Sequence, residues 1–481
     1  MIPFHGLHIN GKSGPAADGA SCELINPANA QPLASVAQGG LADVNRAVEA
    51  AHRAYVGAWS RFTSRDRGQA LQRLSELVRQ HGDQLATAES QNVGKPIGGA
   101  RGEMGAVANC FEYYAGAVNK ACGQTIPVAA DGHCFTFREP LGVCALIVPW
   151  NFPLLITAWK LGPALAMGNT VVIKPAEATP LSALLLADLA LEAGFPEGVI
   201  NVVPGQGSVA GAALVGHRLV RKVSFTGSTT TGTKIMSQAA NDMTRISLEL
   251  GGKSANLVFG DADLDACLDS SLWSVFDNTG QDCCARSRIL VQRAVFERFV
   301  EGFVNRTKAI RVGDPAEETT QMGPLYCAAH REQVVGYLAL AEQEGGMLLC
   351  GGTAPDSGPL ANGSYLTPAV YVGLDNTTRF MREEIFGPVV GIVQFDDESE
   401  AIRIANDSNY GLAASIWTRD VARALRVSRA LEVGMLSVNS SSSVHIEAPF
   451  GGVKQSGMGR EQGMAALDHF SQLKSVFIAG Q

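Results

Sequence analysis

The segment at residues 142–148 reads GVCALIV, and three similar apolar runs follow it: TVVIK (170–174), VINVV (199–203) and KVSFT (222–226). Runs of this length and continuity are typical of strands that are buried on both faces. Helical patterns at 154–167, 180–193 and 207–216 separate them. Because strands that alternate with helices build parallel sheets covered on both sides, this part of the chain predicts an α/β fold.

The same alternation resumes near 255–258 and continues to about 440, which predicts a second α/β domain. Before residue 141, short β-like runs at 7–10 and 22–25 precede helical stretches at 63–78 and 100–120. An Asp131-Gly132 pair lies between extended runs at 125–128 and 134–137. Asp-Gly is a turn signal between strands, so we expect a β-hairpin there.

Composition restricts the class of protein. The chain has 481 residues, of which 46% are hydrophobic and 17% charged, enough to fold around a large core. Its net charge of −8 argues against nucleic acid as a partner. The ten cysteines show no regular framework and are interpreted as reduced thiols. Since no signal peptide or long apolar span is apparent, we expect no membrane partner and a cytoplasmic location.

Polar residues follow the predicted strands at their carboxyl ends, where parallel sheets bind ligands. Lys174 and Glu177 come after the second run, and the turn TGSTTTG (226–232), with Gly227 and Ser228, comes after the fourth. The turn opens a helix whose N-terminus favours an anion, and the Lys/Glu pair suits a ribose diol while disfavouring a 2′-phosphate. These features favour NAD over NADP; taken alone, they also fit a plain turn and a solvated charge pair.

Two further segments carry reactive groups. Glu249 lies in the apolar, glycine-rich stretch LELGGK (248–253), where desolvation raises a carboxyl pKa toward that of a general base. Cys283 and Cys284 follow a Gly-Gln turn, a setting in which a thiolate nucleophile is feasible. The pattern alone does not separate the two cysteines, and a structural glutamate and inert thiols remain alternatives.

Seven motifs, taken together and in this order, resemble the aldehyde dehydrogenase superfamily: PWNFP (149–153), KPAE (174–177), FTGST (225–229), ELGGK (249–253), GQDC (280–283), EEIFGP (383–388) and PFGG (449–452). The resemblance implies a Rossmann-type cofactor domain at 1–120 and 141–252 and an α/β catalytic domain at 253–450. It also implies a small β oligomerisation arm at 121–140 and 467–481. A homodimer or homotetramer is therefore expected.

The resemblance also implies roles for individual residues. Cys283 is the implied nucleophile, Glu249 the general base and Asn151 the side chain of the oxyanion hole. The implied NAD contacts are Pro149, Trp150, Lys174, Glu177, Gly207, Gly227, Ser228, Leu250, Glu384 and Phe386. The implied substrate tunnel is lined by Phe152, Trp159, Phe276, Asp282 and Phe450. No metal is expected.

The implied reaction is NAD-dependent oxidation of an aldehyde to its carboxylic acid through a thiohemiacetal and a thioester on Cys283. Asp282 is similar to an acidic residue of enzymes that act on 4-aminobutyraldehyde, although a solvated side chain is an equal alternative. The loop at 439–447 has no Trp, which argues against recognition of a trimethylammonium group. The other hypotheses are a CoA-acylating semialdehyde dehydrogenase, against which Glu249 argues, and an inactive structural or binding relative.

Overall fold

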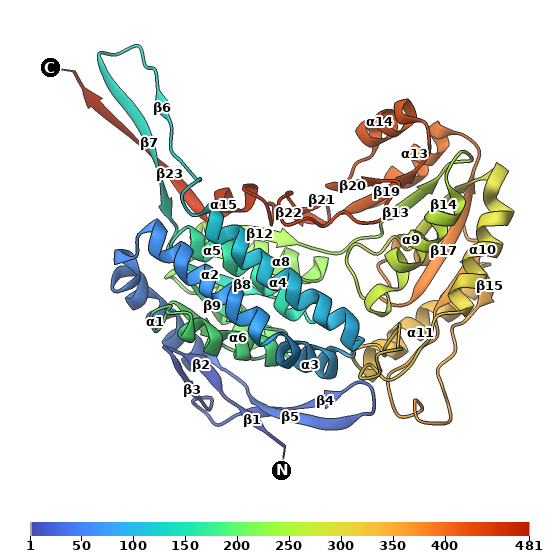
Figure 1. Ribbon diagram of the computed structural model, residues 1–481, viewed down its shortest axis with the longest axis horizontal. Coiled ribbons are helices and arrows are strands. Elements are labelled where there is room, and N and C mark those ends of the chain that lie inside the picture. The colour runs from blue at the N-terminus through green and yellow to red at the C-terminus, as the bar shows by residue number, and fades with distance from the viewer. Residues whose placement is uncertain (1, 481) are drawn as a thin grey trace.

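The four apolar runs form adjacent parallel strands of an eight-stranded sheet in one of two lobes (Figure 1). The computed structural model describes residues 2–480. The strands, in order across the sheet, are β22 (Gly457–Met458), β12 (Arg245–Glu249), β11 (Val220–Thr226), β8 (Val143–Ile147), β9 (Thr170–Lys174), β10 (Ile200–Val202), β2 (Leu7–Ile9) and β3 (Lys12–Gly14). The four strand predictions are confirmed.

Helices cover both faces of this sheet because its strands are apolar on both sides. In β8, Cys144 and Leu146 join one core, whereas Val143, Ala145 and Ile147 join the other. The first core contains residues of α2 (Ser64–Gln80), α3 (Gly82–Val93), α4 (Ile97–Ala117), α5 (Pro153–Ala166) and α6 (Leu181–Glu192). The second contains residues of α1 (Leu41–Val56), α7 (Ala212–Val215) and α8 (Thr229–Ala239). The α/β prediction is confirmed.

The helix predicted at 207–216 differs from the structure. A single π-helical turn, η2 (Gly207–Gly211), precedes the four-residue α7. Glycine lowers helix propensity by about 1 kcal/mol relative to alanine, and this segment begins with one glycine and has another at 211. The regular helix is correspondingly short.

The second lobe contains a seven-stranded sheet in which all pairs but one are parallel. Its strands, in order, are β15 (Met347–Cys350), β16 (Ala369–Val372), β17 (Val389–Phe395), β14 (Arg288–Gln292), β13 (Ala255–Val258), β19 (Ala413–Trp417) and β20 (Met435–Val438). Its helices are α9 (Leu264–Phe276), α10 (Phe296–Lys308), α11 (Ala328–Gln343), α12 (Arg379–Arg382), α13 (Glu398–Asn406) and α14 (Val421–Ala430). The second α/β unit predicted from the sequence is present.

A three-stranded arm projects from the first lobe (Figure 1). It consists of β6 (Thr125–Ile126), β7 (Gly132–Pro140) and β23 (Ser471–Ala479), with β7 in the centre. The antiparallel pair of β6 and β7 lies where the hairpin was predicted. The short helix α15 (Ala465–His469) precedes β23, and a separate small sheet near the N-terminus contains β1 (Phe4–His5), β5 (Gln31–Ala37) and β4 (Ser21–Asn26). Residues 1 and 481, included in the predicted cofactor domain and arm, lie outside the described residues.

The segment at 450–462 connects the two lobes. Its first strand, β21 (Val453–Lys454), pairs with β18 (Tyr410–Gly411), and its second, β22, pairs with β12. Ser456, fully buried between them, donates its hydroxyl to Gly251 O at 2.7 Å and accepts the Gly411 N–H at 3.0 Å. Among the helices of residues 2–480, none is long and apolar enough to cross a membrane.

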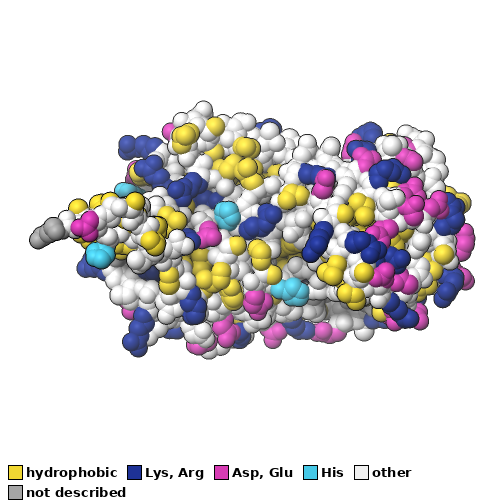
Figure 2. All heavy atoms as spheres, turned by 90° about the horizontal axis from the view of Figure 1, so that it is seen from above, with side chains coloured by type: hydrophobic (Ala, Val, Ile, Leu, Met, Phe, Trp, Pro, Cys, Tyr) yellow, Lys and Arg dark blue, Asp and Glu magenta, His cyan; other side chains and the backbone are white. Residues whose placement is uncertain are grey.

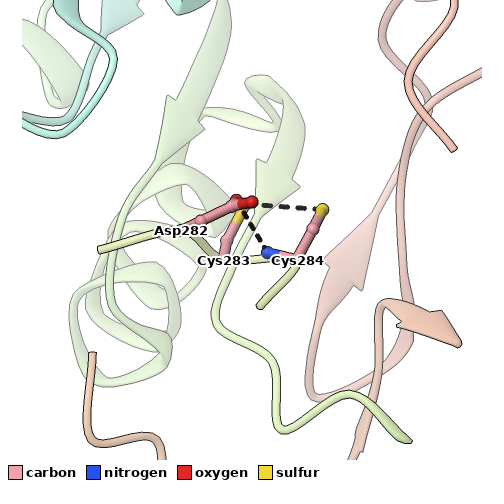
Figure 3. A group of neighbouring side chains, drawn as sticks. All are labelled: Asp282, Cys283 and Cys284. Atoms are coloured by element: carbon pink, nitrogen blue, oxygen red, sulfur yellow. Dashed lines mark hydrogen bonds between the residues drawn. The ribbon is translucent and has the colours of Figure 1, made fainter. Parts of the chain in front are cut away.

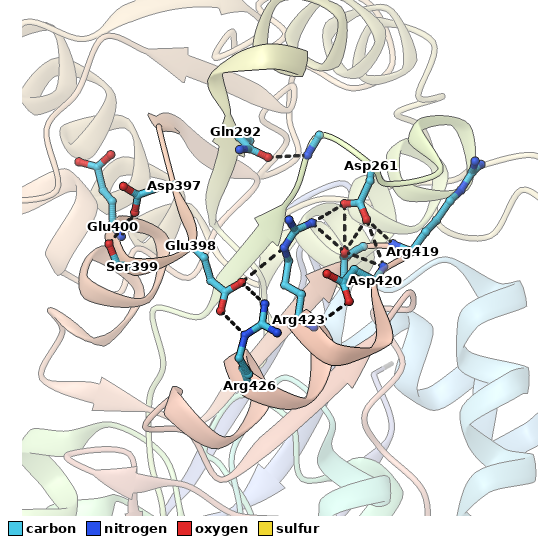
Figure 4. Close-up of polar contacts among 12 residues, drawn as sticks. Asp261, Gln292, Asp397, Glu398, Ser399, Glu400, Arg419, Asp420, Arg423 and Arg426 are labelled. Atoms are coloured by element: carbon cyan, nitrogen blue, oxygen red, sulfur yellow. Dashed lines mark hydrogen bonds and ion pairs between the residues drawn. The ribbon is translucent and has the colours of Figure 1, made fainter.

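A network of charged side chains covers the carboxyl ends of β13 and β19 (Figure 4). Asp261 accepts hydrogen bonds from the Thr418 hydroxyl at 2.8 Å and from the Arg419 and Asp420 N–H groups at 3.0 and 3.1 Å. Arg423 on α14 forms an ion pair with Asp261 at 2.9 Å. The carboxylate therefore joins the loop after β13 to the start of α14.

Replacing Asp261 by Ala is expected to lower the free energy of unfolding by about 1.5 kcal/mol. This is the low end of the range for hydrogen bonds to a charged group, because the carboxylate is partly exposed. Partial burial raises the pKa of Asp261, but the hydrogen bonds from Thr418 and Arg419 and the charge of Arg423 outweigh it and hold the pKa below its ordinary value. The stabilisation is thus complete at neutral pH and is lost as the pH falls through the lowered pKa. Urea unfolding at neutral pH and at about pH 3 measures this effect. Asp356→Ala, in an exposed loop, is the control; an equal loss in both variants contradicts the prediction.

Candidate active site

Cys283 follows a strained turn. Asn278 and Thr279 in η4 (Asp277–Gly280) have left-handed backbone angles, with φ of 46° and 60°, and Gly280 follows with φ of 70°. A Cβ at Gly280 would lie 2.1 Å from the Gly387 carbonyl oxygen, so only glycine fits there. Strained non-glycine residues persist only when their surroundings hold them, and they are common at functional sites.

The two adjacent cysteines, drawn with Asp282 in Figure 3, differ in burial. Cys283 is half-buried, Cys284 is buried, and their Sγ atoms lie 3.9 Å apart. The contact with the Cys284 thiol, burial, and the carboxylates of Asp282 and Glu384 all raise the pKa of Cys283 well above its ordinary value. Exposure therefore favours Cys283 as the thiol that meets a ligand, and the resting protein holds it protonated.

Cys283 lines a cavity of about 500 Å³. Four of the five predicted tunnel residues also line it: Phe152, Trp159, Asp282 and Phe450. The rings of Trp159 and Phe450 lie 4.9 Å apart between centroids, at 50° to one another. They give the cavity that Cys283 lines an aromatic wall.

Phe276 lies elsewhere, which differs from the prediction. Its side chain is completely buried in the core of the second lobe, and its ring centroid is 5.9 Å from that of Phe303 on α10. The last turn of α9 directs it into this core, whereas the next residue, Asp277, lines the cavity. Phe276 therefore supports the site from behind and is not a lining residue.

The cavity has charged lining residues that sequence reasoning missed: Lys95, Glu103 and Asp277. The Lys95 ammonium pairs with Glu103 and lies 4.2 Å from the centroid of the Phe152 ring. Burial raises the pKa of Glu103 to about 8, although Lys95 opposes the shift. No local motif marks these residues, because the cavity collects them from the loop before α4, from α4 itself and from η4.

Asn151 is held against the loop that carries Cys283. Its side-chain Nδ2 donates a hydrogen bond to the backbone carbonyl of Gln281 at 2.9 Å. The backbone carbonyl of Asn151 in turn accepts a hydrogen bond from the side-chain amide of Asn278 at 2.9 Å. A side-chain amide has two N–H donors, so one fixes its orientation and the second remains for a ligand. The buried Asn151 is therefore suited to donate to an oxygen near Cys283.

Glu249 ends β12 in a buried position, 3% exposed. Neither carboxylate oxygen has a hydrogen-bond partner among the described residues. Burial and the charge of Glu461 raise the pKa of Glu249 well above its ordinary value, against the opposing charges of Lys160 and Arg460. A Cβ at Gly451 would lie 2.7 Å from Glu249 Oε1, so the PFGG turn packs closely on the carboxyl group. Such a desolvated carboxyl can exchange a proton near neutral pH.

A buried ion pair accompanies Glu249. Lys160 on α5 and Glu461 pair with each other, and both contact the Ser224 hydroxyl at 3.1 Å. Removing one partner of such a pair costs about 3–5 kcal/mol because the other charge is left buried. Lys160 and Glu461 were not identified from sequence, and neither lies in one of the seven motifs.

The predicted ribose-binding pair lies where β9 ends. Lys174 is buried and donates to the Pro175 carbonyl at 2.9 Å, and burial lowers its pKa to about 8. The exposed Glu177 accepts the Gly207 N–H at 2.7 Å through Oε1. The Gly207 bond orients the carboxylate and leaves Oε2 for a ligand.

Gly227, Ser228 and Leu250 gather at the start of α8. The Ser228 hydroxyl accepts the Thr231 N–H at 3.3 Å as the N-cap of the helix. Leu250 packs on the first turns of α8, where a Cβ at Gly232 would lie 2.6 Å from Leu250 Cδ2. The free N–H groups of this helix end are suited to an anion.

Glu384 joins the end of the first sheet to the second lobe. Its Oε1 accepts the Gly252 N–H at 3.0 Å, and burial raises its pKa to about 7. A Cβ at Gly252 would lie 2.5 Å from the Cys283 carbonyl oxygen. Glu384 is therefore close to the loop that carries Cys283, which agrees with its influence on the Cys283 pKa.

An aromatic cluster surrounds Trp150, which follows the half-buried Pro149. Trp150 stacks on Tyr326 with centroids 3.7 Å apart and meets the edge of Phe386 at 5.3 Å. Phe386 has a left-handed φ of 60°, and its carbonyl accepts His330 Nε2–H at 2.8 Å. These contacts fix Phe386 in a conformation that it would otherwise avoid.

Comparisons with known proteins agree with this geometry. The model of the aldehyde dehydrogenase family matches residues 15–476. An aldehyde dehydrogenase of Aspergillus niger is 42% identical over 472 residues, which are 98% of this chain and 94% of the relative. A betaine aldehyde dehydrogenase of Mesorhizobium japonicum is 43% identical over 477 residues, 99% of this chain and 97% of the relative.

Solved structures share the fold. PnpE from Pseudomonas sp. WBC-3 superimposes with a TM-score of 0.97 at 43% identity, covering 99% of this chain and 98% of that one. A betaine aldehyde dehydrogenase from Staphylococcus aureus, solved in complex with NAD+, gives 0.96 at 38% identity, covering 98% and 94%. From its motifs, its fold and these relatives, the chain belongs to the aldehyde dehydrogenase family.

Proposed function

We propose that the protein oxidises an aldehyde to its carboxylic acid with NAD, using Cys283 as the nucleophile. The observation that carries the proposal is the pairing of a cavity-lining thiol with an amide, Asn151, that is anchored to the same loop. Glu249 is buried and supplies a base. It lies three residues before Gly252, which packs against the Cys283 carbonyl. A structural protein would have no need of this combination.

The residues around the carboxyl ends of β9 and β11 fit a dinucleotide. The N-terminus of α8 and Ser228 would hold the pyrophosphate, while Lys174 and Glu177 would bind the ribose hydroxyls. Glu177, as a carboxylate, would repel a 2′-phosphate, so NAD is favoured over NADP. Glu384 and Phe386 complete the proposed site. When bound, NAD supplies the hydride acceptor.

The residues of the chain divide the remaining chemistry. The Cys283 thiol gives its proton to solvent, and the sulfur then attacks the aldehyde carbon. The oxygen that becomes negative is met by the free N–H of Asn151 and the Cys283 N–H. One such donor is worth about 3–4 kcal/mol of transition-state stabilisation. Loss of hydride leaves a thioester on Cys283. Glu249 then removes a proton from the water that releases the acid, which favours hydrolysis over transfer to CoA.

The proposed roles are tested by Cys283→Ala, Cys284→Ala and Glu249→Gln. We expect Cys283→Ala to abolish NADH formation and Cys284→Ala to retain it, because only Cys283 is assigned a bond to the substrate. Glu249→Gln should preserve a rapid first turnover and slow the steady state by about 100-fold or more, since the thioester then accumulates. Stopped-flow NADH fluorescence with NAD, and with NADP as comparison, measures both phases. Equal losses in burst and steady state would remove Glu249 from deacylation.

The charges around the cavity support a cationic substrate such as the ω-aminoaldehyde 4-aminobutyraldehyde. Among the described residues that line the cavity, Lys95 is the one cation and is paired with Glu103, whereas Asp277 and Asp282 have no ion-pair partner in the lining. Burial and the neighbouring Asp282 raise the pKa of Asp277, against the opposing charge of Lys95, so an incoming ammonium group would relieve the repulsion. Since Lys95 already covers the Phe152 ring, the acids and not this ring would recognise the cation.

Asp277→Asn and Asp282→Asn are each expected to raise the KM for 4-aminobutyraldehyde about 10-fold, equivalent to 1.4 kcal/mol. Butyraldehyde, which has the same chain length and no charge, is the matched control and should keep its KM. Betaine aldehyde, which carries a trimethylammonium group, tests whether the cavity also accepts that group. Parallel rises for the charged and uncharged aldehydes would show that the two acids act on cavity structure and not on charge.

The arm supports a homodimer or homotetramer. β23 pairs with β7 over nine residues and is the outer strand of the arm, so one of its backbone edges is unpaired within residues 2–480. Phe137, Leu473, Phe477 and Ile478 are about half exposed, and hydrophobic side chains gather on the arm in Figure 2. Exposed strand edges with apolar side chains are usually covered by another chain.

A cytoplasmic location also stays a prediction.

Replacing Leu473 and Phe477 together by Asp is expected to reduce the mass in solution to that of one 50.6 kDa chain, because charges would oppose burial of the arm. Size-exclusion chromatography with light scattering measures the mass. Met243→Asp changes a residue that is 89% exposed outside the arm and serves as control. A monomeric unaltered protein, or an unchanged mass in the double variant, would exclude the arm as the interface.

A further inference from the structure

The Asp282-Cys283-Cys284 group has a geometry that the proposed oxidation does not require. One ligand atom from each side chain, two sulfurs and a carboxylate oxygen, lies within 4.8 Å of the other two (Figure 3). Both cysteines line the cavity, although Cys284 is buried. Oxidation at Cys283 needs one thiol only, so the second thiol has no part in that chemistry, and Asp282, proposed above to attract a substrate ammonium group, bonds to none of the reacting atoms.

The spacing fits a bound metal ion. A tetrahedral ion with Zn–S bonds of about 2.3 Å separates its two sulfur ligands by about 3.8 Å. The Cys283 and Cys284 Sγ atoms are already 3.9 Å apart. A disulfide would need about 2.05 Å, so the sulfurs would have to approach by nearly half their separation. The observed geometry therefore suits chelation better than oxidation.

The surroundings favour a cation as well. Asp282 Oδ1 accepts the Cys284 N–H at 2.9 Å, which holds the carboxylate beside the thiols and leaves Oδ2 available as a ligand. Two more carboxyl groups lie close by, since Asp282 raises the pKa of the cavity-lining Asp277 and Glu384 raises the pKa of Cys283. Thiolate and carboxylate ligands are those that Zn²⁺ accepts in proteins.

We propose that Cys283, Cys284 and Asp282 bind one thiophilic divalent cation, such as Zn²⁺, and that this cation inhibits the enzyme. On binding, the two thiol protons leave to solvent and two metal–sulfur bonds form, with no change of oxidation state. The fourth position of the ion faces the cavity and takes water. The inhibitory consequence rests on the proposed function, because the Cys283 sulfur lone pair is no longer free to attack an aldehyde.

Cadmium titration of the reduced full-length protein tests the site without any turnover. Each thiolate bound to Cd²⁺ adds ultraviolet charge-transfer absorbance, so the unaltered protein should show a two-thiolate band that saturates at one equivalent. Cys283→Ser and Cys284→Ser should each show half of this absorbance, and the double variant none. Cys122→Ser, which removes an exposed cysteine elsewhere, is the matched control and should keep the full band. Circular dichroism checks that each variant is folded.

Zn²⁺ should compete for the band and inhibit aldehyde oxidation, and EDTA should reverse the inhibition. In Cys284→Ser, the inhibition constant should rise by more than about 100-fold, the upper end of the cost of removing even an outer partner of a metal site. Asp282→Asn should raise it by at least about 10-fold. The inference would be overturned if Cys284→Ser kept the full cadmium absorbance, or if the double variant still showed the band. A full band in a protein that oxidises no aldehyde would instead overturn the proposed function and retain the metal site.

Discussion

Close contact of Gly251 with the Glu384 carboxylate and of Gly252 with the Cys283 carbonyl sets the geometry of the site. A Cβ at Gly252 would lie 2.5 Å from the Cys283 carbonyl oxygen, and one at Gly251 would lie 2.2 Å from Glu384 Oε2. Because neither position carries a side chain, the chain just after β12 lies directly against the loop that carries Cys283 and against the Glu384 carboxylate. The distance between the strand that ends in Glu249 and the loop that carries Cys283 therefore depends on two glycines and not on the reactive groups.

Buried charge is the second constraint on this region. Glu249 has no hydrogen-bond partner among the described residues, and its neighbours Lys160 and Glu461 are paired with each other in a water-poor environment. Removing such groups from water is costly, so they persist in folds that hold them in place. Within the pair, the charge of Glu461 raises the pKa of Glu249 and the charge of Lys160 opposes the rise, as does Arg460. Proton exchange by Glu249 is thus coupled to the packing of α5 and the 450–462 segment.

The sequence patterns predicted the parts of the molecule that depend on local order. Buried strands such as β8 and β9 are continuous apolar runs, and their carboxyl ends are followed by Asn151, Lys174 and Glu177, so motif and topology agree. Phe276 was misplaced because adjacent residues at the end of α9 face different environments, which a linear pattern does not resolve. Lys95, Glu103 and Asp277 were not found because only tertiary packing brings them together. The roles of the site residues themselves stay predictions.

The 450–462 segment has a mechanical consequence. It adds one strand to each lobe, through β21 and β22, and Ser456 ties the Gly251 and Gly411 backbones at their junction. Moving the lobes apart would have to break at least one of these strand pairs or both hydrogen bonds of the fully buried Ser456 hydroxyl. The fold therefore opposes opening at this junction, because a buried polar group would lose its partners along the line of separation.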